Sequence, residues 1–152
     1  TGGTYANELA TAADLSETSL EQACIDIGDL EDDRGKKIAI RPLRLIIPIQ
    51  LDFEAGRILK STLQNDTGNN AINVLKATGK FPGGVHVNHY LTDTNAWFII
   101  TDSPDGMKHY ERRADDFAAD NDFDTDNAKF KATGRYSFGC TDRRGIFGSP
   151  GG

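Results

Sequence analysis

The first third of the chain carries hydrophobic residues with a helical period. Leu20, Cys24 and Ile27 recur three or four residues apart, which places them on one side of a helix. Ser16 stands where an N-cap is expected, so the helix should begin at about the next residue. Gly35 follows a run of acidic residues and is expected to stop the helix. The pattern therefore predicts an amphipathic helix with Cys24 on its buried side.

A strand and a second helix are expected next. Residues 43–47 are rich in aliphatic side chains and lie between two prolines, which predicts a short strand with limited pairing at its ends. The helical period returns over 51–62 and predicts a second helix there. The polar run 65–70 predicts the loop that closes this helix.

The second half of the chain alternates with the period of a strand. Residues 85–101 predict a hairpin, in which the continuously hydrophobic segment 96–100 is the central, buried strand. A further strand is expected at 107–113, after a turn. Alternation over 127–141 then predicts one long strand that bends at Gly134. Helices and strands together predict an α+β fold.

Composition narrows the class of protein. The chain has 152 residues, of which 38% are hydrophobic, enough for one ordinary core. Its formal net charge of −6 argues against a freestanding protein that binds nucleic acid through phosphate contacts. The sequence has no stretch as long as a membrane helix and no signal-peptide pattern, so no membrane partner is expected. Two cysteines are too few for a disulfide framework.

Charge is unevenly distributed in the second half. Residues 101–126 hold nine acidic side chains against three basic ones, while from residue 127 onward five basic side chains face one acid. Such polarity suits pairing within a hairpin or between copies of the chain. Between copies, it would contribute register and specificity more than affinity. The candidate subunit-contact residues are Asp115, Asp116, Lys129, Lys131, Arg135, Arg143 and Arg144.

Alternating aspartates resemble the start of a calcium-binding loop. Asp120, Asp122 and Asp124 would supply carboxylate oxygens, which are the ligands calcium prefers. The rest of the loop departs from the motif, because Thr125 stands where glycine is needed and Lys131 where a bidentate glutamate belongs. These aspartates are therefore weak metal candidates, and a solvated acidic loop is the better interpretation.

The motifs for catalysis are weak. His86 and His89 are separated by an odd number of positions, which in a strand points them to opposite faces and makes a shared metal difficult. The chain has no G-x-S-x-G elbow, thiol-enzyme signature or phosphate loop. A small calcium- or ligand-binding β-rich module stays as an alternative, as does a hydrolase built on His89 and Asp93, although nothing positive supports the hydrolase. We expect no catalytic residue, no cofactor and no enzyme activity.

The order of segments in the second half carries a family resemblance. The hydrophobic strand 96–100, the strand 107–113, an acidic connection and the strand 129–140 are followed by the Thr-Asp-Arg-Arg-Gly-Ile-Phe-Gly-Ser ending of 141–149. Before them stand a capped helix, a short strand and the helix of 51–59. This order resembles the major head proteins of Mu-like tailed bacteriophages, which share the Hong Kong 97-type capsid fold. The resemblance covers nearly all of the chain.

The resemblance implies a division of the chain. Proteins of this fold have an axial domain, with a central mixed sheet flanked by helices, and a peripheral domain that holds neighbouring capsomers. The implied parts are a flexible lead-in at 1–4, the axial domain at 5–105, returning peripheral-domain strands at 106–148 and a flexible tail at 149–152. The family's N-terminal arm, extended loop and spine helix are absent and the first residue is not Met, so we expect the C-terminal portion of a longer protein.

The function that the resemblance implies is structural. Such a chain would self-assemble with copies of itself into an icosahedral bacteriophage capsid around the DNA genome, contacting the DNA only non-specifically. Scaffolding or decoration proteins are further candidate partners. The subunit would assemble in the cytoplasm of the host bacterium and end in the virion. A nanocompartment shell protein of the same fold is the alternative.

Overall fold

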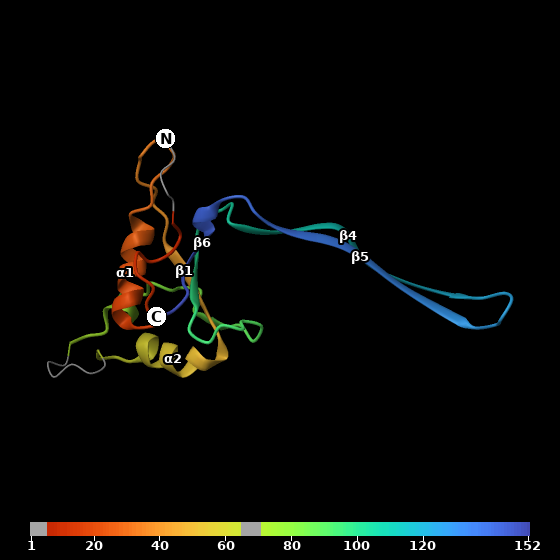
Figure 1. The fold of residues 1–152 in the computed structure, drawn as a ribbon, viewed down its shortest axis with the longest axis horizontal. Helices are drawn as coiled ribbons and strands as arrows, with labels where there is room; N and C mark the ends of the chain where they lie inside the picture. The colour runs from red at the N-terminus through yellow and green to blue at the C-terminus, as the bar shows by residue number, and fades with distance from the viewer. Residues whose placement is uncertain (1–5, 65–70) are drawn as a thin grey trace.

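The structure, a computed structural model, describes residues 6–64 and 71–152. It contains a sheet domain, in which a four-stranded sheet is covered by helices on one face, and a two-stranded hairpin that extends far beyond it (Figure 1). The predicted α+β class is confirmed. Within the described ranges, every helix is too short or too polar to cross a lipid bilayer.

The sheet is mixed in strand direction. It contains β1 (Pro42–Ile47), β2 (Val85–Val87), β3 (Trp97–Thr101) and β6 (Ile146–Ser149), in the order β2-β1-β3-β6. β2 is parallel to β1, whereas β3 is antiparallel to both β1 and β6. The expectation that the 96–100 segment forms a central, buried strand is confirmed by β3.

The predicted hairpin over 85–101 is wrong. β2 and β3 lie on opposite sides of β1, so they do not pair with each other. β2 runs parallel to β1, which requires a long crossover, and residues 48–84 with their helices supply it. The residues between β2 and β3 then carry the chain across β1. Alternation in the sequence indicated the strands correctly but could not indicate their partners.

Helix α1 (Glu17–Gly28) begins where the sequence predicts, because Ser16 caps it. The Ser16 hydroxyl accepts a hydrogen bond from the Ser19 N–H at 3.1 Å, and the Ser19 hydroxyl accepts one from the Ser16 N–H at 2.9 Å. This reciprocal capping box satisfies two backbone donors. The helix ends with Asp29 as its C-cap, before the expected stop at Gly35, which instead lies in a turn at a φ of 75°.

Helix α2 (Asp52–Lys60) confirms the second predicted helix and follows a 3-10 turn (Ile49–Leu51). The sequence did not predict α3 (Val74–Thr78). Asn73 caps α3 and Gly79 closes it in the left-handed region, but so short a helix leaves no periodic stripe in the sequence. The loop expected at 65–70 lies outside the described residues.

The core lies between the helices and the inner face of the sheet. Leu45, Trp97 and Ile99 alternate along their strands with less buried residues and are themselves fully buried. Burying one such side chain contributes about 1.5–3 kcal/mol. Cys24 is half-buried against this core, and burial raises the pKa of its thiol, so it packs as a small hydrophobic residue. The buried cluster comprises Leu9, Leu15, Leu20, Ala23, Ile27, Ile40, Leu45, Ile47, Ala55, Ile58, Leu75, Trp97, Ile99 and Phe147.

The hairpin consists of β4 (Met107–Asn121) and β5 (Ala128–Cys140). β5 matches the long strand expected at 127–141. β4 is twice as long as the strand expected at 107–113, because its acidic second half pairs with β5 along the ladder. The solvated acidic connection that the sequence suggested is therefore mostly strand, and its register shifts on both sides of Arg113.

The C-terminal segment returns to the sheet domain. The expected range 106–148 thus holds two structures, the projecting hairpin and β6, which pairs with β3 in the sheet. Ser149, the first residue of the expected tail 149–152, is the last residue of β6 and only 1% exposed. Beyond it, the Gly152 N–H donates to the Asp14 carboxylate at 3.1 Å.

Candidate functional site

One face of the hairpin carries aromatic side chains that are exposed in the described part of the chain. Alternate residues of β5 share this face, among them Phe130, Tyr136 and Phe138. Phe117 joins them from β4, because it lies opposite Ala132 in the ladder and opposite residues share a face. The four aromatic side chains are between 62% and 83% exposed. Exposed aromatic side chains gathered on one face are typical of an interaction site, and we call this surface the aromatic face.

Near the base of the hairpin, rings on this face contact one another. His109 stacks on Phe138 with ring centroids 4.9 Å apart, and its centroid is 5.7 Å from that of Tyr136. Tyr136 and Phe138 meet edge to face at 5.6 Å. His109 therefore belongs to the aromatic face, while His86 lies on β2 and His89 follows it, in the sheet domain.

The opposite face of the hairpin brings the acidic and basic segments together. Asp120 lies opposite Lys129, and the Lys129 ammonium is 2.7 Å from the carboxylate of Asp122. This hydrogen bond to Lys129 holds the pKa of Asp122 below its ordinary value. The charge polarity noted in the sequence is thus used, in part, inside one chain. Five of the candidate subunit-contact residues are exposed on the hairpin: Asp115, Asp116, Lys129, Lys131 and Arg135.

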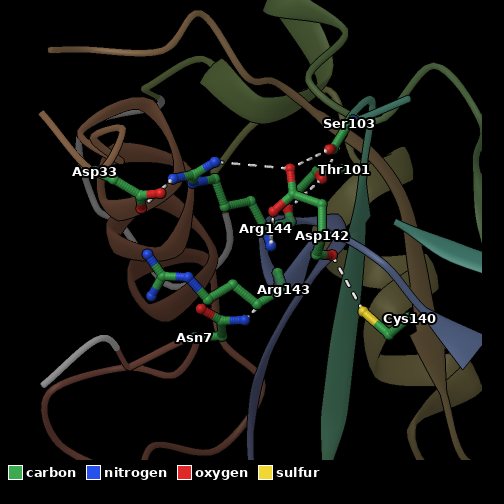
Figure 2. A network of polar contacts seen from close by, with 8 residues as sticks. All are labelled: Asn7, Asp33, Thr101, Ser103, Cys140, Asp142, Arg143 and Arg144. Carbon is green, nitrogen blue, oxygen red and sulfur yellow. Dashed lines mark hydrogen bonds and ion pairs between the residues drawn. The ribbon is translucent and has the colours of Figure 1, made fainter. Parts of the chain in front are cut away.

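A polar network centred on Asp142 connects the hairpin to the sheet (Figure 2). The Asp142 carboxylate accepts hydrogen bonds from the Arg144 N–H and from the Ser103 hydroxyl, both at 3.0 Å. The bond from the Arg144 N–H, with the Ser103 bond and the charges of Arg143 and Arg144, holds the pKa of this carboxyl below its ordinary value. The Cys140 thiol donates to the Asp142 carbonyl at 3.1 Å. We call Ser103 and residues 140–145 the anchor.

The two arginines proposed as subunit contacts lie in the anchor. Arg143 and Arg144 belong to a 3-10 turn (Arg143–Gly145) after the hairpin. The Arg144 side chain is only 17% exposed, and its guanidinium is 3.4 Å from Asp33 and 3.8 Å from Asp142. Arg144 therefore makes contacts within the chain, which the sequence did not predict. Whether either arginine also contacts another subunit stays a prediction.

Hydrogen bonds to backbone carbonyls complete the anchor. The Thr101 hydroxyl, at the end of β3, donates to the Arg144 carbonyl at 2.6 Å. The Asn7 side-chain amide donates to the Arg143 carbonyl (Figure 2). Two segments far apart in the sequence thus hold the turn that follows the hairpin.

A close approach of two glycines fixes the base of the hairpin. A Cβ on Gly145 would lie 2.3 Å from the Gly106 Cα, and a Cβ on Gly106 would lie 2.9 Å from the Gly145 Cα. Real Cβ atoms do not approach backbone so closely, and therefore only glycine fits at these two positions without a shift of the chain. The anchor consequently holds the two ends of the hairpin side by side.

The structure does not assemble a metal site from the weak candidates. Asp120 lies on β4, while Asp122 and Asp124 follow in the turn, and Asp122 is bound to Lys129. In the part of the chain that the structure describes, no three His, Cys, Asp or Glu side chains gather to hold a metal ion. Asp93, part of the hydrolase alternative, accepts hydrogen bonds on its carboxylate from the backbone N–H groups of Asn95 and Ala96. The carboxylate therefore stabilises its own turn.

Sequence reasoning missed the anchor, although one of its signals is local. An aspartate two residues before a bonded N–H is a turn-capping pattern, and Asp142 with Arg144 fits it. No local signal could find the other partners. Ser103 is 39 residues from Asp142, and Asp33 is 111 residues from Arg144.

Comparison with known proteins relates the chain to particle-forming proteins. A family model described as phage capsid protein matches residues 1–148. No curated protein matches the sequence at a significant level.

Two solved structures share the fold. The virus-like particle from Pyrococcus furiosus is similar with a TM-score of 0.52 and 14% identity, over 97% of this chain and 57% of that one. A chain of Mycobacterium phage Che8 is similar with a TM-score of 0.55 and 13% identity, over 95% of this chain and 53% of that one. At such low identity the likeness concerns the fold alone, and the chain spans little more than half the length of either protein.

Proposed function

This chain belongs to the phage capsid protein family, and from that premise we propose that it is a structural subunit of an icosahedral bacteriophage head that encloses the DNA genome. Its partners are other copies of itself in capsomers, with scaffolding or decoration proteins as further candidates. Packaged DNA meets it only non-specifically, in keeping with the net charge of −6. Its role is structural and not enzymatic. It assembles in the cytoplasm of the host bacterium and resides in the virion.

Within such a shell, we assign the sheet domain to the axis of the capsomer and the hairpin to its periphery. This is the arrangement of the Hong Kong 97-type fold in Mu-like phages, which the sequence resembles. The hairpin leaves the sheet where β3 ends and β6 begins, and it reaches well away from the body of the subunit (Figure 1). A projection of this kind suits contact with neighbouring subunits.

The exposed aromatic face carries this proposal. A two-stranded hairpin alone is at best marginally stable in water, and it normally needs further strands or a packed face. Here Phe117, Phe130, Tyr136 and Phe138 remain at least 62% exposed, and the other elements of the described chain do not cover them. Burial of these rings against other parts of the shell would stabilise both the hairpin and the assembly.

Particle formation tests the proposal. The complete coding sequence that contains this chain would be expressed, sedimented and imaged by electron microscopy. We expect closed particles, and we expect Phe117→Ser to lower their yield. Phe53→Ser is the matched control, because Phe53 on α2 is also 79% exposed but lies on the sheet domain. Complete absence of particles would count against the shell role of the chain. Full assembly of Phe117→Ser subunits would count against the role of the hairpin.

The contents of the particles separate the phage head from the nanocompartment alternative. Nuclease-protected genomic DNA in particles from infected cells supports the phage head. A packaged enzyme, with no protected DNA, would instead support a nanocompartment shell.

A further inference from the structure

Along β4, basic residues before Ala114 are matched by acidic residues at the same distances after it. Lys108, Arg112 and Arg113 precede this alanine by six, two and one positions. At the same distances after it stand three aspartates, Asp120, Asp116 and Asp115. The only other charged residue of β4 is Glu111, and its mirror position holds Phe117. The strand is therefore basic before its centre and acidic after it.

Two such strands placed antiparallel about a two-fold axis at Ala114 would be complementary in charge. Directly opposite residues in antiparallel strands have Cβ atoms about 4.5–5.5 Å apart, close enough for charge pairing. By position the pairs would be Lys108 with Asp120, Arg112 with Asp116, and Arg113 with Asp115. The last pair requires the Asp115 carboxylate to turn away from Gly134, against which it lies in the single chain. Each pair would occur twice, because the axis relates the two copies.

The other strand of the hairpin lacks this property. The charged residues of β5 are Lys129, Lys131 and Arg135, all basic. Two β5 edges side by side would place positive charge against positive charge. Charge therefore selects the β4 edge over the β5 edge.

The outer edge of β4 is open to such pairing. β4 pairs with β5 alone in the described chain, so the N–H and C=O groups along its other edge have no strand opposite them. Open edges of this kind are templates for another chain. The register shifts on both sides of Arg113 interrupt the regular strand near its centre. We therefore expect the ladder between copies to form in the regular outer parts of β4, with side-chain pairs near the axis.

Ion pairs within the chain compete only weakly. The Arg113 guanidinium is 3.4 Å from Asp116, with side chains 58% and 63% exposed, and Lys108 binds Asp105. Exposed pairs such as these contribute little, because water screens them. They can exchange for pairs between copies when a partner strand arrives.

We propose that two copies of this chain associate through the outer edges of β4, antiparallel about a two-fold axis at Ala114. The proposal rests on the hairpin being a subunit contact of the shell and names its partner. The contact uses the same surface on both copies and so closes upon itself. It joins two marginal hairpins into one sheet of order β5-β4-β4-β5, with the aromatic faces of both copies on the same side.

Disulfide trapping tests the position of the axis. In a Cys24→Ala, Cys140→Ser background, Ala114→Cys places two thiols at the axis, within the range of about 4.4–6.8 Å between Cα atoms that a disulfide needs. Ala118→Cys is the matched control on the same strand. It would hold the two thiols roughly 27 Å apart at about 3.4 Å per residue. We expect the Ala114→Cys dimer to form at least about tenfold faster, and equal rates or no dimer would overturn the proposal.

Charge reversal tests the complementarity, by sedimentation equilibrium of the full chain. Arg112→Glu with Arg113→Glu sets acid against acid, and Asp115→Arg with Asp116→Arg sets base against base. Each double variant should dimerise at least about tenfold more weakly. A mixture of the two, or one chain carrying all four changes, should dimerise as well as the unaltered chain. Arg34→Glu with Lys36→Glu changes the net charge equally in a distant exposed loop and should have no effect.

The outcomes separate this proposal from the shell function. Normal particles built from Arg112→Glu, Arg113→Glu subunits would overturn the β4 pairing and leave the shell role standing. Failure of the mixed variants to associate would also overturn the pairing. If the unaltered chain forms no particles but its Ala114→Cys variant traps a disulfide, the pairing stands and the shell role does not.

Discussion

A methyl group at Gly145 should loosen the base of the hairpin. The Cβ of Gly145→Ala would lie 2.3 Å from the Gly106 Cα and 3.3 Å from the Gly106 carbonyl carbon. The backbone at Gly145 is outside the left-handed region, so the cost is steric and not conformational. Overpacking of a close-packed site costs about 1–3 kcal/mol. Because the obstacle is backbone, which yields less than a side chain, we expect a loss of about 2–3 kcal/mol in the free energy of unfolding.

Urea denaturation followed by tryptophan fluorescence measures this loss. Trp97 is the only tryptophan, and it lies fully buried in β3, so its emission reports unfolding of the sheet domain. Gly56→Ala is the matched control, because its new methyl group would meet no atom of the described chain within 4 Å beyond its own helical turn. In the interior of α2, alanine should raise the free energy of unfolding by about 0.5–1 kcal/mol.

Opposite signs for the two glycine substitutions are the decisive result. If Gly145→Ala unfolds at the same urea concentration as the unaltered chain, or a higher one, the close approach to Gly106 is not rigid. The anchor would then not hold the two ends of the hairpin in the way that the distances imply.

Three further substitutions test the core, the anchor and the aromatic face. Leu45→Ala should lower the free energy of unfolding in urea by about 2–5 kcal/mol, because Leu45 is fully buried, while Leu43→Ala, at a 37% exposed position, should cost less than about 1 kcal/mol. The pKa of Asp142 is lower in the folded chain than in the unfolded one. The ionised carboxylate therefore stabilises the fold above the unfolded pKa, and this stabilisation is lost as the pH falls through the folded pKa. The difference in thermal stability between the unaltered chain and Asp142→Asn should therefore be largest near neutral pH and shrink in acid; a difference that does not change with pH would contradict this reasoning. Phe117→Ser should change the free energy of unfolding by no more than about 0.5 kcal/mol, and a loss above about 1 kcal/mol would indicate that the ring is packed within the chain.

Local patterns in the sequence were sufficient to locate most elements. The stripe of Leu20 and Ile27 and the cap at Ser16 predict α1, because both signals act within one or two turns. The continuous hydrophobic segment of β3 predicts a buried strand for the same reason. α3 was not predicted, because a helix of little more than one turn is too short to show a hydrophobic period.

The pairing of the strands depended on the tertiary structure. Alternation shows that Val85 and Val87 are extended but says nothing about the strand beside them. Their partner is β1, reached through a crossover of 37 residues between Ile47 and Val85. Likewise the acidic half of β4 has the composition of a loop, and only the ladder with β5 makes it a strand.

The charges of the hairpin divide in the same way. The order of basic and acidic residues around Ala114 is a property of the sequence alone, as is the basic character of β5. The fold decides that Lys129 forms an ion pair with Asp122 within the chain and that Arg144 forms one with Asp33. Within residues 6–64 and 71–152, the fold also leaves the β4 edge without a second strand and the aromatic rings exposed. Burial and pairing arise from contacts between distant segments, so they cannot be read from any one segment.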